Sequence, residues 1–356
     1  MKKDNIKKIL IIRLSALGDT IHTLPMALAI KKQYPDAQID WVVEDKASKF
    51  IINNPLITNV YELPKKRWSR NKNKAANLIE FIQIIKRIRK EEYDIALDPQ
   101  QLFKSGIILG LSGAKRRITL DGGRECSFLF ANEIIKTGKK PFDINYHVVK
   151  RNLDIARYLG CKELKAEFVI PDFKESVSPN IKNIIKNLDD SKKTVVIAPA
   201  TTWYNKHWTK NGWQDVINNL KDKYNILITA SEKEKELIYK ILFGAENNGN
   251  IYDLSGMTSL GDLVYIYKHS DMVISPDSGS AHVAWAAGAQ SIITLFFATS
   301  EKRTAPYGDK YFSISPNIKC HPCMKRKCQN RAFPLDCVYK ITPDQIINIV
   351  NNVLQE

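Results

Sequence analysis

Short apolar runs alternate with amphipathic stretches along almost the whole chain. The first run, 9–12, follows a charged lead and precedes helical spacing over 21–34, which Pro35 interrupts. A second apolar run at 39–43 completes a strand–helix–strand unit. Fully apolar strands that alternate with helices are typical of a parallel sheet covered on both faces. The pattern therefore predicts the start of a doubly wound α/β domain.

The same alternation continues to the end of the chain, with one interruption at about 166–193. Pro171, Ser178 and Pro179 in that stretch indicate a linker. We therefore expect two domains, 1–175 and 176–356. Further strands are expected at 93–98, 194–200, 225–229, 251–254 and 291–296, and further helices at 77–90, 181–188, 212–221, from 230 and after 259. The stretch 63–70 is expected to be a basic loop.

The stretch 272–288 has the pattern of a buried strand, a tight loop and a helix that ends at Gly288. Asp277 or Ser278 can cap the first turn of this helix. Gly279 and its neighbour have almost no side-chain bulk, so a ligand could approach the backbone amides closely. Exposed amides at a helix N-terminus bind phosphate, because they carry partial positive charge. The alternative is an ordinary strand–helix unit of a parallel sheet.

Charged residues recur where the predicted strands end. Asp19 lies between the first strand and the first helix, the position where α/β folds bind ligands, and it could be either a catalytic base or a helix N-cap. The dinucleotide fingerprint G-x-G-x-x-G is absent at this loop. Basic residues follow other strands and together favour an anion-binding cleft; they are Lys65, Lys66, Arg67, Arg70, Lys104 and Arg124.

The chain has 356 residues, with 54 basic against 38 acidic residues and a net charge of +16. This balance favours anionic partners, but no motif for nucleic-acid binding is present. No apolar run reaches the length of a membrane span, and the run at 9–12 is too short for a signal-peptide core. We therefore expect a cytoplasmic protein.

Six cysteines are present, and four of them form the spacing C-x2-C-x4-C-x8-C near the C-terminus. In a reducing compartment such a set is a structural metal site or a group of free thiols. Zinc sites usually show two short C-x2-C pairs, whereas this segment has one, so both alternatives stay open. The four residues are Cys320, Cys323, Cys328 and Cys337.

Several motifs resemble those of the bacterial lipopolysaccharide heptosyltransferases, glycosyltransferase family 9. The stretch 13–19 with 22–25 is similar to the opening of that family, and 98–105 is similar to its D-x-Q-G-L-x-K-S segment, with Gln101 where glycine is usual. The loop 201–208 matches the nucleotide loop of the family, and 277–282 matches its D-[ST]-G-x-x-H signature. Within the family, the chain looks most like heptosyltransferase I.

This resemblance implies a GT-B fold, in which two Rossmann-like doubly wound domains face a central cleft. It implies an enzyme that transfers heptose from ADP-L-glycero-β-D-manno-heptose to the Kdo-lipid A inner core with inversion, without a metal or other cofactor. The first domain would bind the acceptor and the second the nucleotide sugar. The protein would work at the cytoplasmic face of the inner membrane as a peripheral protein, and would bind no nucleic acid. We also expect the last helix to pack back on the first domain.

The resemblance also implies a role for individual residues. Asp19 would be the general base, Lys206 would neutralise the leaving diphosphate, and Glu234 would hold the ribose. The acceptor would meet the six basic residues of the first domain named above. The residues that would line the phosphates or hold the sugar are Thr201, Thr202, Asp277, Ser278, Gly279 and His282.

Other functions remain as alternatives. Heptosyltransferase II or III, or another family 9 transferase with a different acceptor, would keep the fold and change the substrate. A basic surface-binding protein without catalysis is a third reading, and the presence of both Asp19 and Lys206 argues against it.

Overall fold

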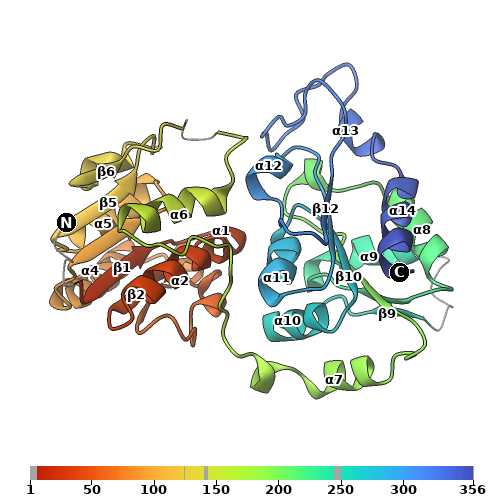
Figure 1. Ribbon diagram of the computed structural model, residues 1–356, viewed down its shortest axis with the longest axis horizontal. Coiled ribbons are helices and arrows are strands. Elements are labelled where there is room, and N and C mark those ends of the chain that lie inside the picture. The colour runs from red at the N-terminus through yellow and green to blue at the C-terminus, as the bar shows by residue number, and fades with distance from the viewer. Residues whose placement is uncertain (1–5, 124, 140–142, 244–249, 356) are drawn as a thin grey trace. The chain divides into compact units, whose positions relative to one another are not determined.

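The computed structural model describes residues 6–123, 125–139, 143–243 and 250–355. The chain divides into two compact units, Met1–Asp172 and Phe173–Glu356, which are described separately below (Figure 1). This division lies three residues before the boundary expected from the sequence. Among the described residues, no helix is long and apolar enough to cross a membrane.

The first unit is built on a sheet of six strands in the order β3-β2-β1-β4-β5-β6. Each neighbouring pair of strands is parallel, so the sheet has the doubly wound pattern that the alternating apolar runs predicted. The strands are β1 (Lys8–Ile12), β2 (Gln38–Glu44), β3 (Val60–Leu63), β4 (Ile95–Asp98), β5 (Arg116–Leu120) and β6 (Glu133–Ile135).

Helices cover both faces of this sheet. Leu10 and Ile12 of β1 share a buried cluster with residues of α4 and α5, so the alternate residues Ile9 and Ile11 point to the opposite face. Helices α2 and α6 pack against each other and lie in front of the strands in Figure 1. The helical segments are α1 (Leu17–Ile21), α2 (Leu24–Gln33), η1 (Ser48–Phe50), α3 (Lys65–Arg70), α4 (Lys74–Lys90), α5 (Phe103–Leu111), η2 (Ser127–Phe130) and α6 (Val148–Tyr158).

The helix expected over 21–34 forms as α2, which starts at Leu24, and a separate short helix, α1, ends at Ile21. Pro25 fits the first turn of α2 but could not continue a helix from α1. One local prediction for the first unit was wrong. The basic stretch expected to be a loop forms the helix α3 directly after Pro64. Lysine and arginine are good helix formers, and Glu80 of α4 anchors α3 by accepting a hydrogen bond from the Trp68 indole at 2.6 Å.

The second unit repeats the architecture with the strand order β12-β11-β10-β7-β8-β9, again with parallel neighbours. Five of its strands lie where the apolar runs predicted them, whereas β12 was not predicted. They are β7 (Thr194–Ile197), β8 (Asn225–Ile228), β9 (Ile251–Asp253), β10 (Met272–Pro276), β11 (Ile292–Leu295) and β12 (Tyr311–Ile314).

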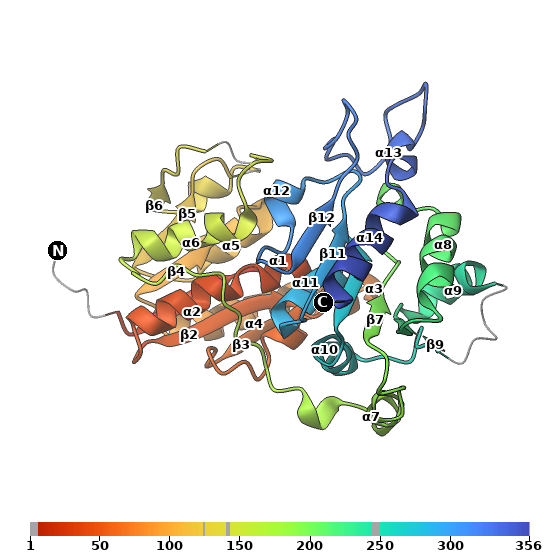
Figure 2. The same cartoon turned by 45° about the vertical axis from the view of Figure 1, so that its right-hand side comes forward.

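The last helix, α14, belongs to the core of this second unit. It packs against α8, and Figure 2 shows α14 next to the C-terminus. Ile346 and Val350 on its inner face are fully buried in the apolar cluster of the unit. The helical segments are η3 (Lys174–Ser176), α7 (Pro179–Lys186), η4 (Tyr204–Lys206), α8 (Lys210–Leu220), η5 (Glu232–Glu234), α9 (Lys235–Leu242), α10 (Leu260–Lys268), α11 (Gly279–Ala287), α12 (Glu301–Thr304), α13 (Asp336–Tyr339) and α14 (Pro343–Leu354).

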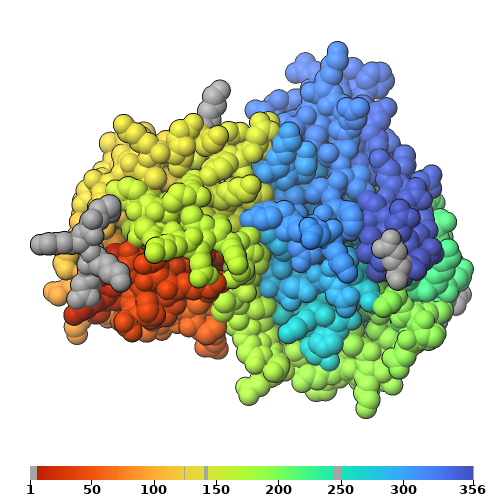
Figure 3. All heavy atoms as spheres, viewed as in Figure 1, coloured from red at the N-terminus to blue at the C-terminus, as the bar shows by residue number. Residues whose placement is uncertain are grey.

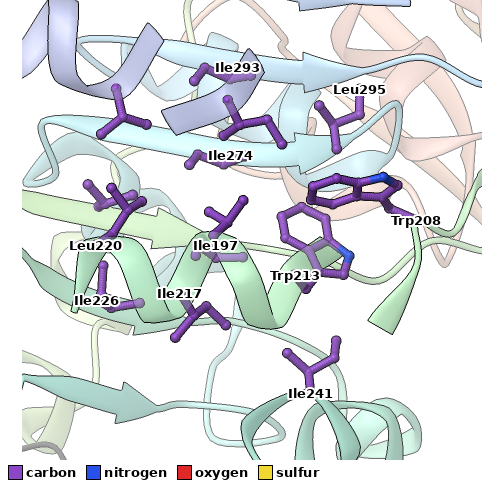
Figure 4. Close-up of a cluster of buried hydrophobic side chains, with 14 of the residues drawn as sticks. Ile197, Trp208, Trp213, Ile217, Leu220, Ile226, Ile241, Ile274, Ile293 and Leu295 are labelled. Carbon is purple, nitrogen blue, oxygen red and sulfur yellow. The ribbon is translucent and has the colours of Figure 1, made fainter. Parts of the chain in front are cut away.

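A pair of tryptophans anchors the loop that follows β7. Trp208 from this loop and Trp213 from α8 pack edge to face with ring centroids 5.1 Å apart (Figure 4). Both side chains are buried among the aliphatic residues of the sheet, including Ile197 and Leu295. Burial of two such large side chains holds the loop firmly, and this loop carries Lys206.

Candidate active site

The stretch 272–288 forms the strand, loop and helix that the sequence predicted. Strand β10 ends at Pro276, and α11 runs from Gly279 to Ala287. Ser278, one of the two expected caps, is the N-cap, and its hydroxyl accepts a hydrogen bond from the Ser280 amide at 3.2 Å. Gly288 ends the helix with φ of 75°, the left-handed conformation that favours glycine.

The Asp277 carboxylate is the centre of the polar contacts at this strand end. It is 4% exposed and forms an ion pair with Lys206 at 2.6 Å. The Thr299 hydroxyl donates to it at 2.6 Å, and Nε2 of His282 lies 3.6 Å away. Burial alone would raise the pKa of Asp277, but the charges of Lys206 and His282 outweigh it and lower the pKa below its usual range. Asp277 is therefore held as a buried carboxylate.

Lys206 reaches this carboxylate from the loop after β7. Its ammonium group also donates to the backbone oxygen of Asp277 at 2.9 Å and lies 4.9 Å from the centre of the Trp203 ring. His207 contacts the Thr201 carbonyl at 2.8 Å, which holds the two ends of the loop together. Thr201 is buried, whereas Thr202 is exposed. A lysine with all these contacts has one fixed position rather than a mobile one.

Glu234, the expected ribose ligand, lies in η5 just after β8. Its carboxylate accepts hydrogen bonds from the Ser231 amide at 2.8 Å and hydroxyl at 2.7 Å, so it also caps its own helix. Strands β10, β7 and β8 are neighbours, and parallel strands end at one edge of the sheet. The predicted residues of the second domain therefore share one sheet edge, with Lys206, Asp277 and His282 grouped closely.

In the first unit, Asp19 occupies the third position of α1 rather than the N-cap, which is Ala16. Its carboxylate accepts a hydrogen bond from the Ala16 amide at 3.1 Å and pairs with Arg13 at 2.8 Å. The Asp19 side chain is 43% exposed, whereas Arg13 is buried and donates to the Pro99 carbonyl at 3.0 Å. Asp19 is thus a carboxylate with a fixed orientation and open access to solvent.

Two of the predicted acceptor cations share a carboxylate that the sequence reading did not single out. Glu44, the last residue of β2, accepts hydrogen bonds from Lys104 at 2.6 Å and Lys65 at 3.1 Å. Lys104 also donates to the Ser15 hydroxyl at 3.2 Å. The only signal for Glu44 in the sequence was its place at a strand end.

Three other predicted cations surround a hollow of about 470 Å³ beside α3. Its lining is Asp45, Lys66, Arg67, Arg70 and Asn71. Arg67 also pairs with Glu80. The remaining predicted cation, Arg124, lies outside the described residues.

The segment 98–105 places a buried carboxylate and an unusual backbone next to each other. Asp98 is fully buried, and burial raises its pKa to about 6 although the Gln100 and Gln101 amides donate to it at 3.0 Å. Gln101 has φ of 60°, a conformation that favours glycine. Its side chain compensates by donating to the Leu120 carbonyl at 2.6 Å and accepting from Arg151 at 2.8 Å. The glutamine thus replaces glycine at a structural position.

Cys320, Cys323 and Cys328 lie between β12 and α13, and Cys337 lies in α13, in the part of the second unit that projects at the top of Figures 1 and 3. All four cysteines are free, and no group of described residues could hold a metal ion. The pKa of Cys337 is raised to about 11 by burial and, to a smaller extent, by the neighbouring thiols.

Comparison with known proteins agrees with the motifs. Residues 81–333 match the model of glycosyltransferase family 9 (heptosyltransferase). The chain belongs to this family. It is therefore a glycosyltransferase, which removes the reading of a non-catalytic surface-binding protein.

Similar curated proteins and solved structures cover nearly the whole chain. Lipopolysaccharide heptosyltransferase 1 of Campylobacter coli is 30% identical over 84% of this chain and 86% of that protein. The lipopolysaccharide core heptosyltransferase OpsX of Haemophilus influenzae is 28% identical over 85% and 82%, respectively. The E. coli heptosyltransferase WaaC with ADP superposes with a TM-score of 0.75 at 20% identity, over 97% of this chain and 99% of that one. These likenesses confirm the predicted GT-B fold.

Proposed function

We propose that this glycosyltransferase moves heptose from ADP-L-glycero-β-D-manno-heptose to the Kdo-lipid A inner core of lipopolysaccharide, as heptosyltransferase I does. The observation that carries the proposal is the fixed Lys206 beside the N-terminus of α11, in a loop that matches the family motif. The comparisons support the donor, since similar structures of E. coli WaaC contain ADP or ADP-2-deoxy-2-fluoro heptose.

On the donor side, Lys206 and the first amides of α11 would supply the positive potential that a leaving diphosphate needs. A side chain added at Gly279 would meet no atom within 4 Å, so there is room beside these amides for a ligand. Asp277 would position Lys206 rather than contact the phosphates. Thr201, Thr202, Ser278 and His282 would line the same region, and Glu234 would hold the ribose.

On the acceptor side, Asp19 would act as the general base. It would take the proton of an acceptor hydroxyl as that oxygen attacks the anomeric carbon, and the bond to the diphosphate of ADP would break on the opposite face. This single displacement inverts the sugar and balances charge without a metal ion. Arg13 would fix the orientation of the carboxylate, because it pairs with Asp19 from a buried position.

Basic residues of the first unit would then bind the anionic acceptor, which carries carboxylates and phosphates at the cytoplasmic face of the inner membrane. Lys66, Arg67 and Arg70 around the hollow are the best placed of the six. A second candidate is another acceptor position, since lipopolysaccharide heptosyltransferase 3 of E. coli is also 26% identical over 82% of this chain.

The test is a panel of acceptors with a defined core, each incubated with ADP-heptose and the purified protein. Transfer to Kdo-lipid A before any other acceptor is the expected result, and transfer only to an acceptor that already carries heptose would favour the second candidate. Excess EDTA should leave the rate unchanged, because Lys206 and the α11 amides act in place of a cation. Loss of turnover that magnesium restores would contradict the proposed metal-free mechanism. Loss of stability alone, restored by zinc, would instead implicate the cysteines.

A further inference from the structure

The outer face of α4 exposes large apolar side chains to solvent. Leu78, Ile79 and Ile82 are 58%, 57% and 43% exposed, although the same helix buries Ile84 and Ile88 against the sheet. Residues three or four apart share one face of a helix, so Leu78 and Ile82 lie in line and Ile79 lies beside them. A helix that is apolar on two faces has a second partner besides its own core.

Positive charge surrounds this apolar patch. Residues 64–90 hold ten lysines and arginines against a single acidic residue, Glu80. The Glu80 carboxylate is already used by the Trp68 indole and Arg67. Lys86 continues the line of Leu78 and Ile82 one turn further and is exposed. The patch is therefore apolar at its centre and cationic at its margins.

Hydrogen bonds join α4 to α3 and so to the hollow lined by Lys66, Arg67 and Arg70. The Asn77 amide donates to the Trp68 carbonyl at 3.0 Å, and the Asn71 amide donates to the Asn77 oxygen at 2.8 Å. The two helices therefore form one rigid hairpin. A surface that the patch contacts would be held at a fixed place relative to the hollow.

We propose that Leu78, Ile79, Ile82 and Lys86, here called the docking face, bind the protein to the surface of an anionic lipid bilayer. Apolar side chains enter the boundary between headgroups and acyl chains, while the cations contact anionic headgroups. This inference rests on the proposed function in one respect, because a lipid-anchored acceptor gives the enzyme a reason to bind a membrane. The hairpin then presents the hollow to headgroups of the same leaflet.

Two other occupants fit the docking face less well. A second copy of the chain would place two of these cationic faces against each other, and like charges repel at close range. A free anion such as inorganic phosphate would satisfy the cations but would leave the three apolar side chains in water. Only an anionic bilayer uses both the apolar centre and the cationic margin.

The experiment measures binding to sedimented vesicles of phosphatidylcholine, with and without a quarter of phosphatidylglycerol, in the absence of donor and acceptor. The test variant combines Leu78→Gln, Ile79→Gln and Ile82→Gln, because glutamine keeps the helix propensity. The matched control combines Ile52→Gln, Leu111→Gln and Ile134→Gln, three exposed residues of the same unit with 41%, 41% and 45% exposure. Circular dichroism and the melting temperature check that both variants fold.

The wild type and the control should bind the anionic vesicles but not the neutral ones. The test variant should bind the anionic vesicles at least about tenfold less than the wild type. Lys86→Gln should reduce binding about fivefold, and 10 mM inorganic phosphate should not compete. The proposal is wrong if the test variant binds like the control. It is also wrong if sedimentation velocity shows a wild-type dimer that the test variant loses while vesicle binding is unchanged, since the face would then join two copies.

The same variants separate this proposal from the proposed function. With a water-soluble acceptor lacking its acyl chains, the test variant should keep the wild-type rate of transfer. If the wild type transfers no heptose but binds anionic vesicles through the docking face, the proposed function fails and the docking face stands. If transfer is normal and neither variant differs from wild type on vesicles, the docking face fails alone.

Discussion

Asp98 in the first unit and Asp277 in the second unit are both buried carboxylates at the end of a central parallel strand, yet their pKa values move in opposite directions. Burial raises the pKa of Asp98 to about 6, and its nearest donors are two backbone amides. Asp277 has a pKa below its usual range, because Lys206 compensates its charge. Equal burial therefore gives different pKa values, because Lys206 pairs directly with Asp277 whereas the charge of Arg13 has a smaller effect on Asp98 than its hydrogen bonds do.

The two pKa values indicate two different roles: Asp98 is a structural carboxylate, whereas Asp277 positions another charged side chain. Asp98 orders the backbone of its loop and stays away from solvent. Asp277 holds Lys206 at the edge of the sheet, where we propose that the nucleotide binds. In the first unit the proposed base is another carboxylate, Asp19, whose side chain is 43% exposed. The first unit thus has a solvent-exposed carboxylate at Asp19, and the second has a buried carboxylate at Asp277 whose charge Lys206 neutralises.

The largest effect should follow from removal of the open carboxylate. Asp19→Asn keeps the shape and loses the proton acceptor, so turnover should fall by about two to four decades. ADP binding, measured by calorimetry, should be nearly unchanged because the nucleotide motifs lie in the second unit. Asp36→Asn, a change at another exposed carboxylate of the first unit, serves as the control. Near-normal turnover of Asp19→Asn would exclude it as the base.

Lys206→Met should leave Asp277, like Asp98, as a buried carboxylate without a directly paired cation. It leaves a buried carboxylate without its cation, so the free energy of unfolding should fall by about 3–5 kcal/mol in denaturant titration. The double variant Lys206→Met with Asp277→Asn should recover much of this stability but none of the activity. A single variant as stable as wild type would show that the ion pair does not hold the loop.

Asp98→Asn should alter how stability depends on pH. The folded-state pKa of about 6 lies above the unfolded value of about 3.9, so the folded state binds a proton first as pH falls. In wild type the free energy of unfolding should therefore rise by up to about 3 kcal/mol as pH falls from 6 to 4, and this gain is lost as pH rises through 6. The asparagine variant should lack this dependence in urea titrations across that range. The contribution of Asp277 has the opposite sign and is lost only below about pH 4.

The smallest effect should come from the exposed cations of the first unit. Arg70→Gln in the hollow should raise the KM for an anionic acceptor by about three- to tenfold at low salt, because exposed charge pairs are weak. The effect should shrink at higher ionic strength, and ADP affinity should stay constant. Lys210→Gln, an exposed change in the second unit, is the control. Loss of ADP binding by Arg70→Gln would contradict the proposed division of roles.

Periodicity predicted the doubly wound α/β fold, with three strands of the first sheet and five of the second, because those runs are mostly apolar. It did not predict β3, β5, β6 or β12, in which polar residues interrupt the apolar ones. It also predicted the helix that starts beside Ser278, where a small-residue loop follows an apolar run. It did not predict the helix α3, since this helix depends on a partner, Glu80, from a later helix. The sheet order, which makes β10 and β7 neighbours, is likewise absent from local pattern.

The motifs located the candidate site, but the sequence could not show which charges neutralise each other. Glu44 pairs with two of the predicted acceptor cations, and Thr299 donates to Asp277 from the loop after β11. Neither residue belongs to a recognised motif. Such contacts join residues that lie 20 to 60 positions apart, so only the fold brings them together.

Gln101 ties the motif loop of the first unit to a helix that the chain forms much later. Its side-chain oxygen accepts from the Arg151 guanidinium on α6, and its amide nitrogen donates to carbonyls at the end of β5. A glycine would allow the same backbone turn but would form none of these contacts. Arg151 of α6 therefore fixes the loop that leads to Lys104. Loss of the Arg151 side chain should make this loop, and with it Lys104, more mobile.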